Sequence, residues 1–307
     1  MTAGLMDRGR RRGPLGRLLA NGAAALSLAV LSALVLACFA APLIGALLGL
    51  DATTPDLFSI AAPPSPAHPL GTDEIGRDLL MRLLEGGRVS LTVGLAAALS
   101  ASAIGTLFGL IAGWRGGILD AALMRLADSV ISLPLLPLLV VLAAIDPEKA
   151  GLPPALVHSE SFSLYRIVII IALVGWTTTA RLVRGSVLSL REREFIEAAR
   201  AQGLPASRIL FRHLLPNAAS PILVAATLTI GNVILFESVL SFLGLGVQPP
   251  IPSWGNMLTG AQDLIASAPM LAIWPGLLIF AAVIAFNFLG DGLQEALDPR
   301  SEARQRH

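Results

Sequence analysis

Four side chains between His68 and Asp78 are of types that bind metal ions. His68, Asp73, Glu74 and Asp78 all lie within the sequence HPLGTDEIGRD. Their spacing matches no standard arrangement of zinc ligands. Asp, Gly and Pro in such a short stretch are instead typical of an Asx-type turn. We therefore favour a solvated loop here and expect no metal site.

The residues needed for common enzyme chemistry do not occur in the patterns that enzymes use. Lys149 is the sole lysine and lies in DPEKAG, so the chain has no Gly-x4-Gly-Lys-Ser/Thr loop for ATP. The histidines form no HExxH motif, and no serine lies in GxSxG. Gly244 and Gly246 lack the third glycine of a dinucleotide fingerprint, and Cys38 is the single cysteine. We expect no catalytic residue and no cofactor in this chain, which makes a membrane enzyme the least favoured hypothesis.

The composition is that of a membrane protein with several spans. Apolar residues make up 54% of the 307 residues and charged residues 14%, and the mean hydropathy is +0.73. These values are too apolar for a soluble domain of this length. The net charge of +1 averages basic and acidic segments and gives no indication of a nucleic-acid partner, so we expect membrane lipid as surroundings and no nucleic acid.

Six apolar segments are candidates for transmembrane helices, which need about 20 residues each. The first follows a basic N-terminus and could be taken for a signal peptide, but it continues past Cys38, well beyond a cleavable core. We therefore interpret it as a retained span. The six segments are 18–50, 89–112, 121–145, 164–180, 218–236 and 270–289.

The distribution of arginine predicts the side of each loop, because cytoplasmic loops carry an excess of Lys and Arg. The loop between the fourth and fifth spans is rich in arginine, whereas no Lys or Arg occurs between Arg212 and Arg300. Both termini are then cytoplasmic. The first external loop is an exception with Arg77, Arg82 and Arg88, although several acidic residues accompany them.

These observations give a domain organisation and a fold class. The fold is predicted to be an all-α integral membrane protein with six transmembrane helices and a cytoplasmic helix-turn-helix between spans four and five. The divisions are a basic cytoplasmic N-terminus (1–17), a first transmembrane helix (18–50), an external loop (51–87), a five-helix transmembrane domain (88–291) with its loop at 191–216, and a cytoplasmic tail (292–307).

Polar or helix-breaking residues in and beside the spans are candidates for a transport pathway or its gating. Asp128 follows Arg125 by three residues, which favours a local ion pair. Glu237 begins the run ESVLSFLGLG, which we interpret as a re-entrant or interfacial helix. Pro134 and Pro137 interrupt the third span and permit a kink. For Asp128, Pro134 and Glu237, pathway and purely structural roles both stay open.

The stretch from Glu194 to Pro216, EFIEAARAQGLPASRILFRHLLP, combines charge with helical periodicity in an otherwise apolar chain. It predicts two short amphipathic helices. Gly203 stands where the first helix needs a left-handed residue to end, and Pro205 suits the first turn of the second. We expect the second helix to end at Pro216, because proline cannot continue the hydrogen-bond pattern.

This stretch resembles the EAA signature of binding-protein-dependent ABC importer permeases, which is Glu-Ala-Ala, three residues, Gly, nine residues, Ile, one residue, Leu-Pro. Here the pattern is EAARAQG at 197–203 followed by Leu215 and Pro216, with His213 where an apolar residue is usual. FRHLLPN at 211–217 is similar to the version found in dipeptide, oligopeptide and nickel importer permeases. The segments HPLGTDEIGRD, SFLGLGVQPPIPSWGNML and FNFLGDGLQEALDPR resemble the same branch.

The resemblance implies a permease subunit that moves di- or oligopeptides, or a related small solute such as nickel, across a bacterial cytoplasmic membrane. It implies four partners: a second homologous permease, two cytoplasmic ATPase subunits that use ATP, and an extracytoplasmic substrate-binding protein. The external segments 51–88 and 246–263 would face the binding protein. By position, the residues that would dock onto the ATPase are Glu197, Ala198, Ala199, Gly203, Leu215 and Pro216.

An ion-gradient-driven secondary transporter is the alternative from another class. Such a protein would favour paired ionisable residues inside the membrane and inverted repeats with broken helices. Neither feature is evident in the sequence, so the importer permease is the preferred interpretation.

Overall fold

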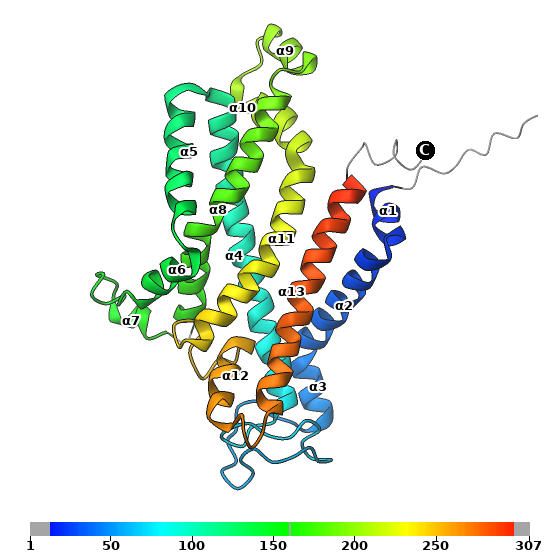
Figure 1. Ribbon diagram of the computed structural model, residues 1–307, viewed down its shortest axis with the longest axis vertical. Helices are drawn as coiled ribbons and strands as arrows, with labels where there is room; N and C mark the ends of the chain where they lie inside the picture. Colours follow the sequence, from blue (N-terminus) through cyan, green and yellow to red (C-terminus); the bar gives the residue numbers. More distant parts are fainter. Residues whose placement is uncertain (1–12, 160, 298–307) are drawn as a thin grey trace, which may run out of the picture.

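The computed structural model describes residues 13–159 and 161–297, and in that part the regular elements are helices (Figure 1). One isolated β-bridge joins Thr72 and Asp78. The arginines of the N-terminal stretch before residue 13 and those of the tail after residue 297 lie outside the described residues. Their cytoplasmic location therefore stays a prediction.

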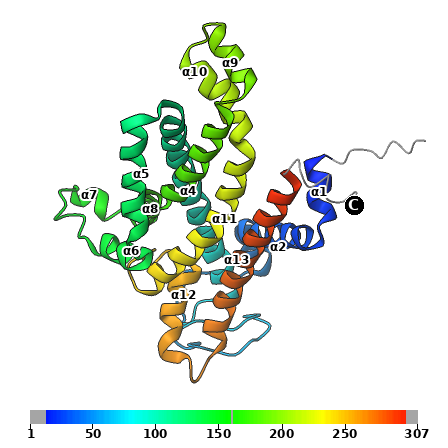
Figure 2. The same ribbon diagram turned by 45° about the horizontal axis from the view of Figure 1, so that its top comes forward.

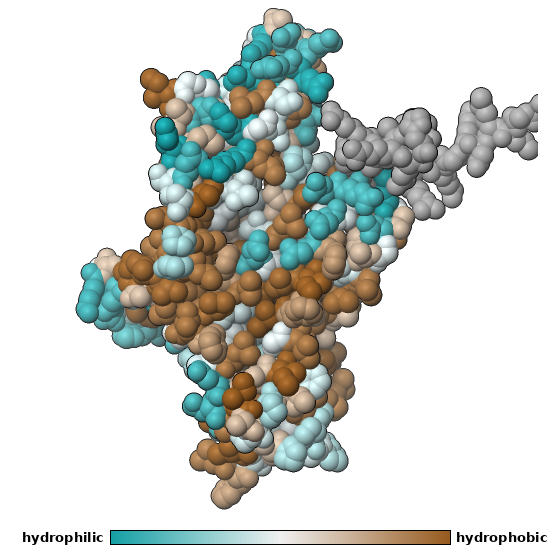
Figure 3. Space-filling view, viewed as in Figure 1, coloured by the Kyte–Doolittle hydropathy of each residue, from teal (hydrophilic) through white to brown (hydrophobic). Residues whose placement is uncertain are grey.

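Five helices are long and apolar enough to cross a membrane, and a bent pair of shorter helices makes up a sixth candidate span. The five are α2 (Gly22–Phe39), α4 (Leu79–Arg115), α8 (Phe162–Leu190), the continuous run from Ala206 to Phe242 that ends in α11 (Leu215–Phe242), and α13 (Met270–Leu297). The expected six-span, all-helical membrane fold is confirmed. Apolar side chains form a broad band across the middle of the face in Figure 3.

The first apolar segment is three helices rather than the single one expected for 18–50. They are α1 (Pro14–Ala20), α2 and α3 (Ala41–Leu48). The first break follows from Asn21, whose Oδ1 accepts hydrogen bonds from the amides of Ala23 (3.1 Å) and Ala24 (3.2 Å) and so caps α2. Asn21 Nδ2 also donates to Glu295 of α13 at 2.8 Å, which fixes this corner against the last helix.

Helix α4 is much longer than the expected second span, because it begins at Leu79 and runs for 37 residues to Arg115. Its first residues, 79–87, belong to the stretch 51–87 that we expected to form an external loop. Asp78 caps it by accepting the Met81 amide at 2.9 Å. Arg82, which made this stretch look like a loop, is buried and forms an ion pair with Asp73 at 3.0 Å.

Glycines on one face of α4 allow it to lie directly against α8. Gly105, Gly109 and Gly113 recur at intervals of four and therefore share a face. A Cβ atom would lie 2.4 Å from the Trp176 carbonyl oxygen at Gly105 and 2.6 Å from that of Ala180 at Gly109. Small residues are what permit such close helix packing in a membrane, so α4 and α8 form a tightly packed pair.

The third expected span, 121–145, is sharply broken. It consists of α5 (Gly117–Ser132) and α6 (Leu135–Ala144), which meet at 90°. Pro134 lies at the break as the residue before α6, and Leu133 ahead of it is extended (ψ 140°). Proline lacks an amide hydrogen and disfavours helical geometry in the preceding residue, which explains a full corner where a kink was expected.

The molecule has two ends, which we call the α9 end and the α12 end after the short helices that lie there. α9 (Glu194–Ala201) and α10 (Ala206–Ile209) project at the top of Figure 1, whereas α12 (Trp254–Ala261) lies at the bottom with the segment that precedes α4. Figure 2 shows the same separation from a second direction. Two short elements, α7 (Pro154–Val157) and the 3-10 turn η2 (Gln262–Leu264), complete the described fold.

The re-entrant helix expected to begin at Glu237 does not exist at that position. Glu237 lies inside α11, which continues to Phe242, and the separate short helix α12 turns back into the protein after it. Trp254 at the start of α12 is fully buried. The sequence pattern thus predicted a short helix near this end but placed its start at Glu237, 17 residues before the start of α12 at Trp254.

Candidate functional site

The turn between α9 and α10 has the geometry predicted from Gly203. This residue is left-handed (φ +74°). Its amide donates to the Arg200 carbonyl at 2.9 Å, and the Leu204 amide donates to the Ala199 carbonyl at 3.2 Å. The two bonds form a Schellman motif, which satisfies carbonyls at a helix end. Pro205 is the residue before α10 rather than part of its first turn.

The second helix of this element does not end at Pro216, contrary to expectation. α10 passes through a π-helical turn, η1 (Leu210–Leu214), directly into α11. Pro216 lies in the first turn of α11, where a missing amide hydrogen is tolerated. His213 is half-buried within the π turn, and its carbonyl accepts the Asn217 side-chain amide at 2.6 Å. The α9–α10 element is therefore continuous with a helix that is long and apolar enough to span a membrane.

One face of this helix-turn-helix is packed inward and the other is free. Ile196 of α9 and Ile209 of α10 are buried with Leu110 of α4 and Val187 of α8 in a single apolar cluster. Ala199 is 5% exposed and belongs to that inner face. Its small side chain lets α9 lie close to the helices beneath it, so Ala199 contributes to the position of the outer face rather than to its surface.

The outer face carries four of the six residues identified from the signature. Glu197, Ala198, Gly203 and Pro216 are exposed, whereas Leu215 is half-buried at the base of α11. No atom lies within 4 Å of the place where a Cβ of Gly203 would be. The outer face therefore has a surface of small side chains beside one carboxylate, with room for another molecule.

Two arginines attach the element to the end of α4. Nη1 of Arg191 donates to the Gly113 carbonyl at 3.0 Å. The Arg200 guanidinium lies over the Trp114 ring, 4.4 Å from its centre, in a cation–π contact. Through these contacts, a force applied to α9 acts directly on α4.

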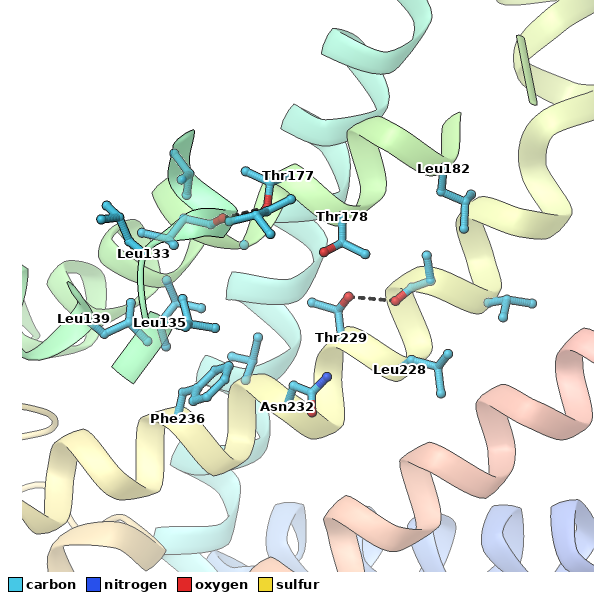
Figure 4. A pocket seen from close by; sticks show the side chains of 18 of the residues that line it. Leu133, Leu135, Leu139, Thr177, Thr178, Leu182, Leu228, Thr229, Asn232 and Phe236 are labelled. Atoms are coloured by element: carbon cyan, nitrogen blue, oxygen red, sulfur yellow. Dashed lines mark hydrogen bonds between the residues drawn. The ribbon is translucent and has the colours of Figure 1, made fainter. Parts of the chain in front are cut away.

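A cleft of about 500 Å³ lies between α8, α11 and the broken pair α5 and α6 (Figure 4). Its walls are mostly apolar, and the described residues that line it include no charged side chain. The polar groups come from Thr177 and Thr178 of α8, from Thr229 and Asn232 of α11, and from Gln294 of α13. Thr178 and Asn232 are exposed to the cleft, and Figure 4 shows the two helices presenting these groups to one hollow.

The acidic residue Asp128 does not pair with Arg125 as expected. Its carboxylate contacts Arg181 of α8. Asp120, about two turns earlier in α5, accepts a hydrogen bond from Arg184 Nη2 at 2.7 Å. The partners come from another helix, which a pattern along one helix does not reveal. Asp128 is not among the residues that line the cleft.

Glu237 is fully buried at the α12 end, away from the cleft. Its carboxylate accepts hydroxyl hydrogen bonds from Ser241 (2.7 Å) and from Ser90 of α4 (3.0 Å). Ser90 Oγ in turn accepts the Trp254 amide at 3.2 Å, and Ser241 Oγ accepts the Val247 amide at 3.0 Å. This carboxylate network connects α4, α11 and the start of α12.

The stretch His68–Asp78 is not the solvated loop that we favoured. The Asp73 carboxylate is 3% exposed and pairs with Arg77 Nε at 2.7 Å as well as with Arg82. Asp78 is buried and contacts His68 Nδ1 at 3.0 Å. Arginine partners from the next turn and from α4 neutralise the buried charge, so the acidic residues form an ion cluster that anchors the segment before α4.

Comparison with known proteins identifies the family. Residues 105–303 match the family described as "Binding-protein-dependent transport system inner membrane component". The chain belongs to this family. Membership makes it a transport permease subunit of an ATP-driven importer, and it does not fit the ion-gradient alternative. The match covers the α9–α10 element, the cleft and the carboxylate of Glu237, but not Ser90.

The permease has named relatives over most of its length. It is 44% identical over 240 residues, 78% of this chain and 74% of the relative, to a dipeptide transport system permease protein of Alkalihalophilus pseudofirmus. A putative peptide permease protein of Brucella suis is 40% identical over 288 residues, 93% of this chain and 90% of the relative. A glutathione transport system permease protein of Pectobacterium atrosepticum is 42% identical over 237 residues, 77% and 74% of the two chains.

Sequence reasoning missed several residues that the structure brings into these sites. Thr178 and Asn232 are polar positions within apolar helices, and this contrast is a signal that would have nominated them. Ser90 and Trp114 gave no such signal, because their importance depends on partners more than 80 residues away, Trp254 and Arg200.

Proposed function

We propose that this permease moves peptides, or a related small solute, across a bacterial cytoplasmic membrane as one of two homologous permease subunits. The chain has no phosphate-binding loop of its own, so separate ATPase subunits hydrolyse the ATP. The observation that carries the proposal is the exposed α9–α10 element, which is fixed to α4, α8 and α11. The names of the relatives, which include dipeptide and peptide permeases, support the solute class.

In the proposed orientation the α9 end is cytoplasmic and both termini lie on that side. The α9 end carries exposed arginines such as Arg193 and Arg208, as cytoplasmic segments do. The opposite end has Arg77 and Arg82, which were an exception to this pattern in the sequence. Both are engaged in ion pairs with Asp73, so they add little to the surface charge of the external side.

The α12 end is then the external side, where a substrate-binding protein delivers the solute. The loop before α4 presents Phe58, which is fully exposed. Asp56 and Asp51 give this loop a fixed shape by hydrogen bonds to Ser59 and Thr54. The hydroxyl of Thr54 lowers the pKa of Asp51 to about 2, so this carboxylate is ionised and hydrogen-bonded at neutral pH. A preformed loop with an exposed aromatic tip suits a protein partner.

In the docking assignment, Glu197, Ala198, Gly203 and Pro216 form the surface that contacts the ATPase, and Ala199 and Leu215 hold that surface in place. A Cβ atom at Gly203 would have open space around it, so a side chain there would begin in contact with no other described part of the permease. It would instead occupy space that the ATPase requires. A bulky substitution at Gly203 should therefore disturb the contact with the ATPase and not the packing of the permease, which makes the assignment testable.

The test replaces Gly203 with leucine and, as a matched control, with asparagine. Both residues bear the cost of a left-handed backbone, which asparagine tolerates better, but only leucine adds a bulky apolar group. In proteoliposomes containing all subunits, we expect Gly203→Leu to hydrolyse ATP without coupled uptake and Gly203→Asn to keep most of the transport. Normal ATP-driven uptake by Gly203→Leu would overturn the docking assignment.

A further inference from the structure

The cleft between α8 and α11 places polar groups where an apolar surface is the rule. Thr178 lies near the middle of α8 and Asn232 near the middle of α11. Both face the cleft (Figure 4) and are exposed. Among the described residues, neither the Thr178 hydroxyl nor the Asn232 amide has a hydrogen-bond partner. Polar groups at this depth in a membrane are costly unless another polar group or water satisfies them.

The hydrogen-bonding side chains in the cleft are all uncharged hydroxyls or amides, the amide of Gln294 included. Thr177 and Thr229 each donate their hydroxyl hydrogen to a carbonyl of their own helix, at 3.4 and 2.7 Å, so their oxygens can only accept. Asn232 offers two donors and a carbonyl acceptor, and Thr178 offers a hydroxyl that does both. This set of donors and acceptors can pair with the amide groups of a peptide backbone, each of which presents one N–H donor and one carbonyl acceptor.

The cleft also lacks any means of selecting by charge. Its lining includes apolar side chains such as Leu139 and Phe236, and the described lining residues carry no ionisable group. Arg181 and Asp128, which lie next to lining residues in the sequence or within two positions of them, form an ion pair with one another and are not part of the lining. The volume of about 500 Å³ is in the range of small-molecule sites.

We propose that Thr178, Thr229 and Asn232 form a solute-contacting site that binds the amide groups of a peptide backbone and is indifferent to side-chain charge. This proposal rests on the proposed import of peptides and specifies where the permease touches them. The permease thereby accepts peptides of different sequence, and discrimination by charge takes place elsewhere in the transport system.

The test replaces Asn232 with aspartate, which has nearly the same shape but carries a negative charge. If solute contacts this residue, the site should then select peptides by their side-chain charge. Uptake of Ala-Ala, Ala-Lys and Ala-Glu is measured in proteoliposomes with all subunits, as maximal rates at saturating binding protein. We expect Asn232→Asp to raise the ratio of Ala-Lys to Ala-Glu rates about fivefold to tenfold, because a single charge in a poorly hydrated site attracts one peptide and repels the other. Asn232→Leu should lower all three rates while leaving their ratios unchanged.

The matched control is Asn287→Asp. Asn287 is half-buried in α13 beside Gly231 and is not part of the cleft lining. The same chemical change there can weaken folding, but it should leave the ratio of the three rates as in the unmodified permease. A ratio that shifts equally in both variants would show a long-range charge effect and overturn the proposal.

Two further outcomes would contradict the site. If Asn232→Asp left the Ala-Lys to Ala-Glu ratio unchanged while the complex stayed assembled, solute would not contact this residue. If instead Asn232→Asp prevented co-purification of the second permease, a helix of that subunit would fill the cleft. Failure of the unmodified complex to take up any of the three peptides with ATP would contradict the proposed function itself. This outcome differs from failure of the site proposal, in which the unmodified complex transports the peptides.

Discussion

The carboxylate network around Glu237 gives a prediction that can be worked through in energy. Ser90 and Ser241 each donate a hydroxyl hydrogen to Glu237 and accept a backbone amide, from Trp254 and Val247 respectively. Both hydroxyls are therefore satisfied only while Glu237 is an acceptor. Glu237→Leu removes the acceptor for both, in a place that is fully buried.

The expected size of the effect follows from these two bonds. Leaving a buried polar group without a partner costs about 1–3 kcal/mol, so two hydroxyls give a loss of roughly 2–6 kcal/mol. Removal of the buried carboxylate itself offsets part of this loss, because its desolvation was costly. Glu237→Gln retains one acceptor oxygen and should fall between the unmodified protein and Glu237→Leu.

The assay is the thermal unfolding midpoint of the purified complex, combined with a double-mutant cycle between Glu237→Leu and Ser241→Ala. Because the two residues share a hydrogen bond, we expect a coupling energy of about 0.5–3 kcal/mol. Exposed Glu194, replaced by leucine, serves as the control and should leave the midpoint nearly unchanged. Additive effects of the Glu237 and Ser241 changes, or an unaltered midpoint in Glu237→Leu, would refute the network as a source of stability.

Two other expectations follow from close packing and from surface exposure. Gly109→Leu should destabilise the permease by about 1–3 kcal/mol through overpacking, because a Cβ there would lie 2.6 Å from the Ala180 carbonyl oxygen. Gly185→Leu on α8 should be mild, because a Cβ at Gly185 would have open space around it. Comparison of their unfolding midpoints checks this, and equal midpoints would contradict the packing of α4 on α8. Phe58→Ser should weaken the binding of the substrate-binding protein several-fold without changing the unfolding midpoint, as measured by titration of the reconstituted complex; unaltered affinity would remove Phe58 from that surface.

Features that depend on local chemistry were predictable from the sequence. Gly203 could be assigned a left-handed turn because the residues around it determine where a helix ends. The spans could be located because the membrane requires long apolar helices, and the helix-turn-helix of α9 and α10 could be located from its periodicity and its glycine. In each case the deciding interactions lie within about one or two helical turns.

Features that depend on distant partners were not predictable in the same way. Arg82 made the start of α4 look like a loop, since the sequence does not show that Asp73 neutralises it. Asp128 was assigned to Arg125 because its actual partner, Arg181, is on another helix. Pro216 was expected to end a helix, but the π turn ahead of it places proline in a first turn, where it is tolerated. The cleft itself exists only after α8 and α11 have packed.

The length of α4 has a mechanical consequence. With 37 residues it spans roughly 55 Å, nearly twice the thickness of about 30 Å of a hydrocarbon core. Arg191 and Arg200 hold one end, and the Asp73 cluster and Trp254 hold the other. A rigid tilt of about 10° displaces one end against the other by roughly 10 Å. If the α9 end docks onto the ATPase as proposed, small rotations imposed there would become movements of solute size at the opposite end of α4.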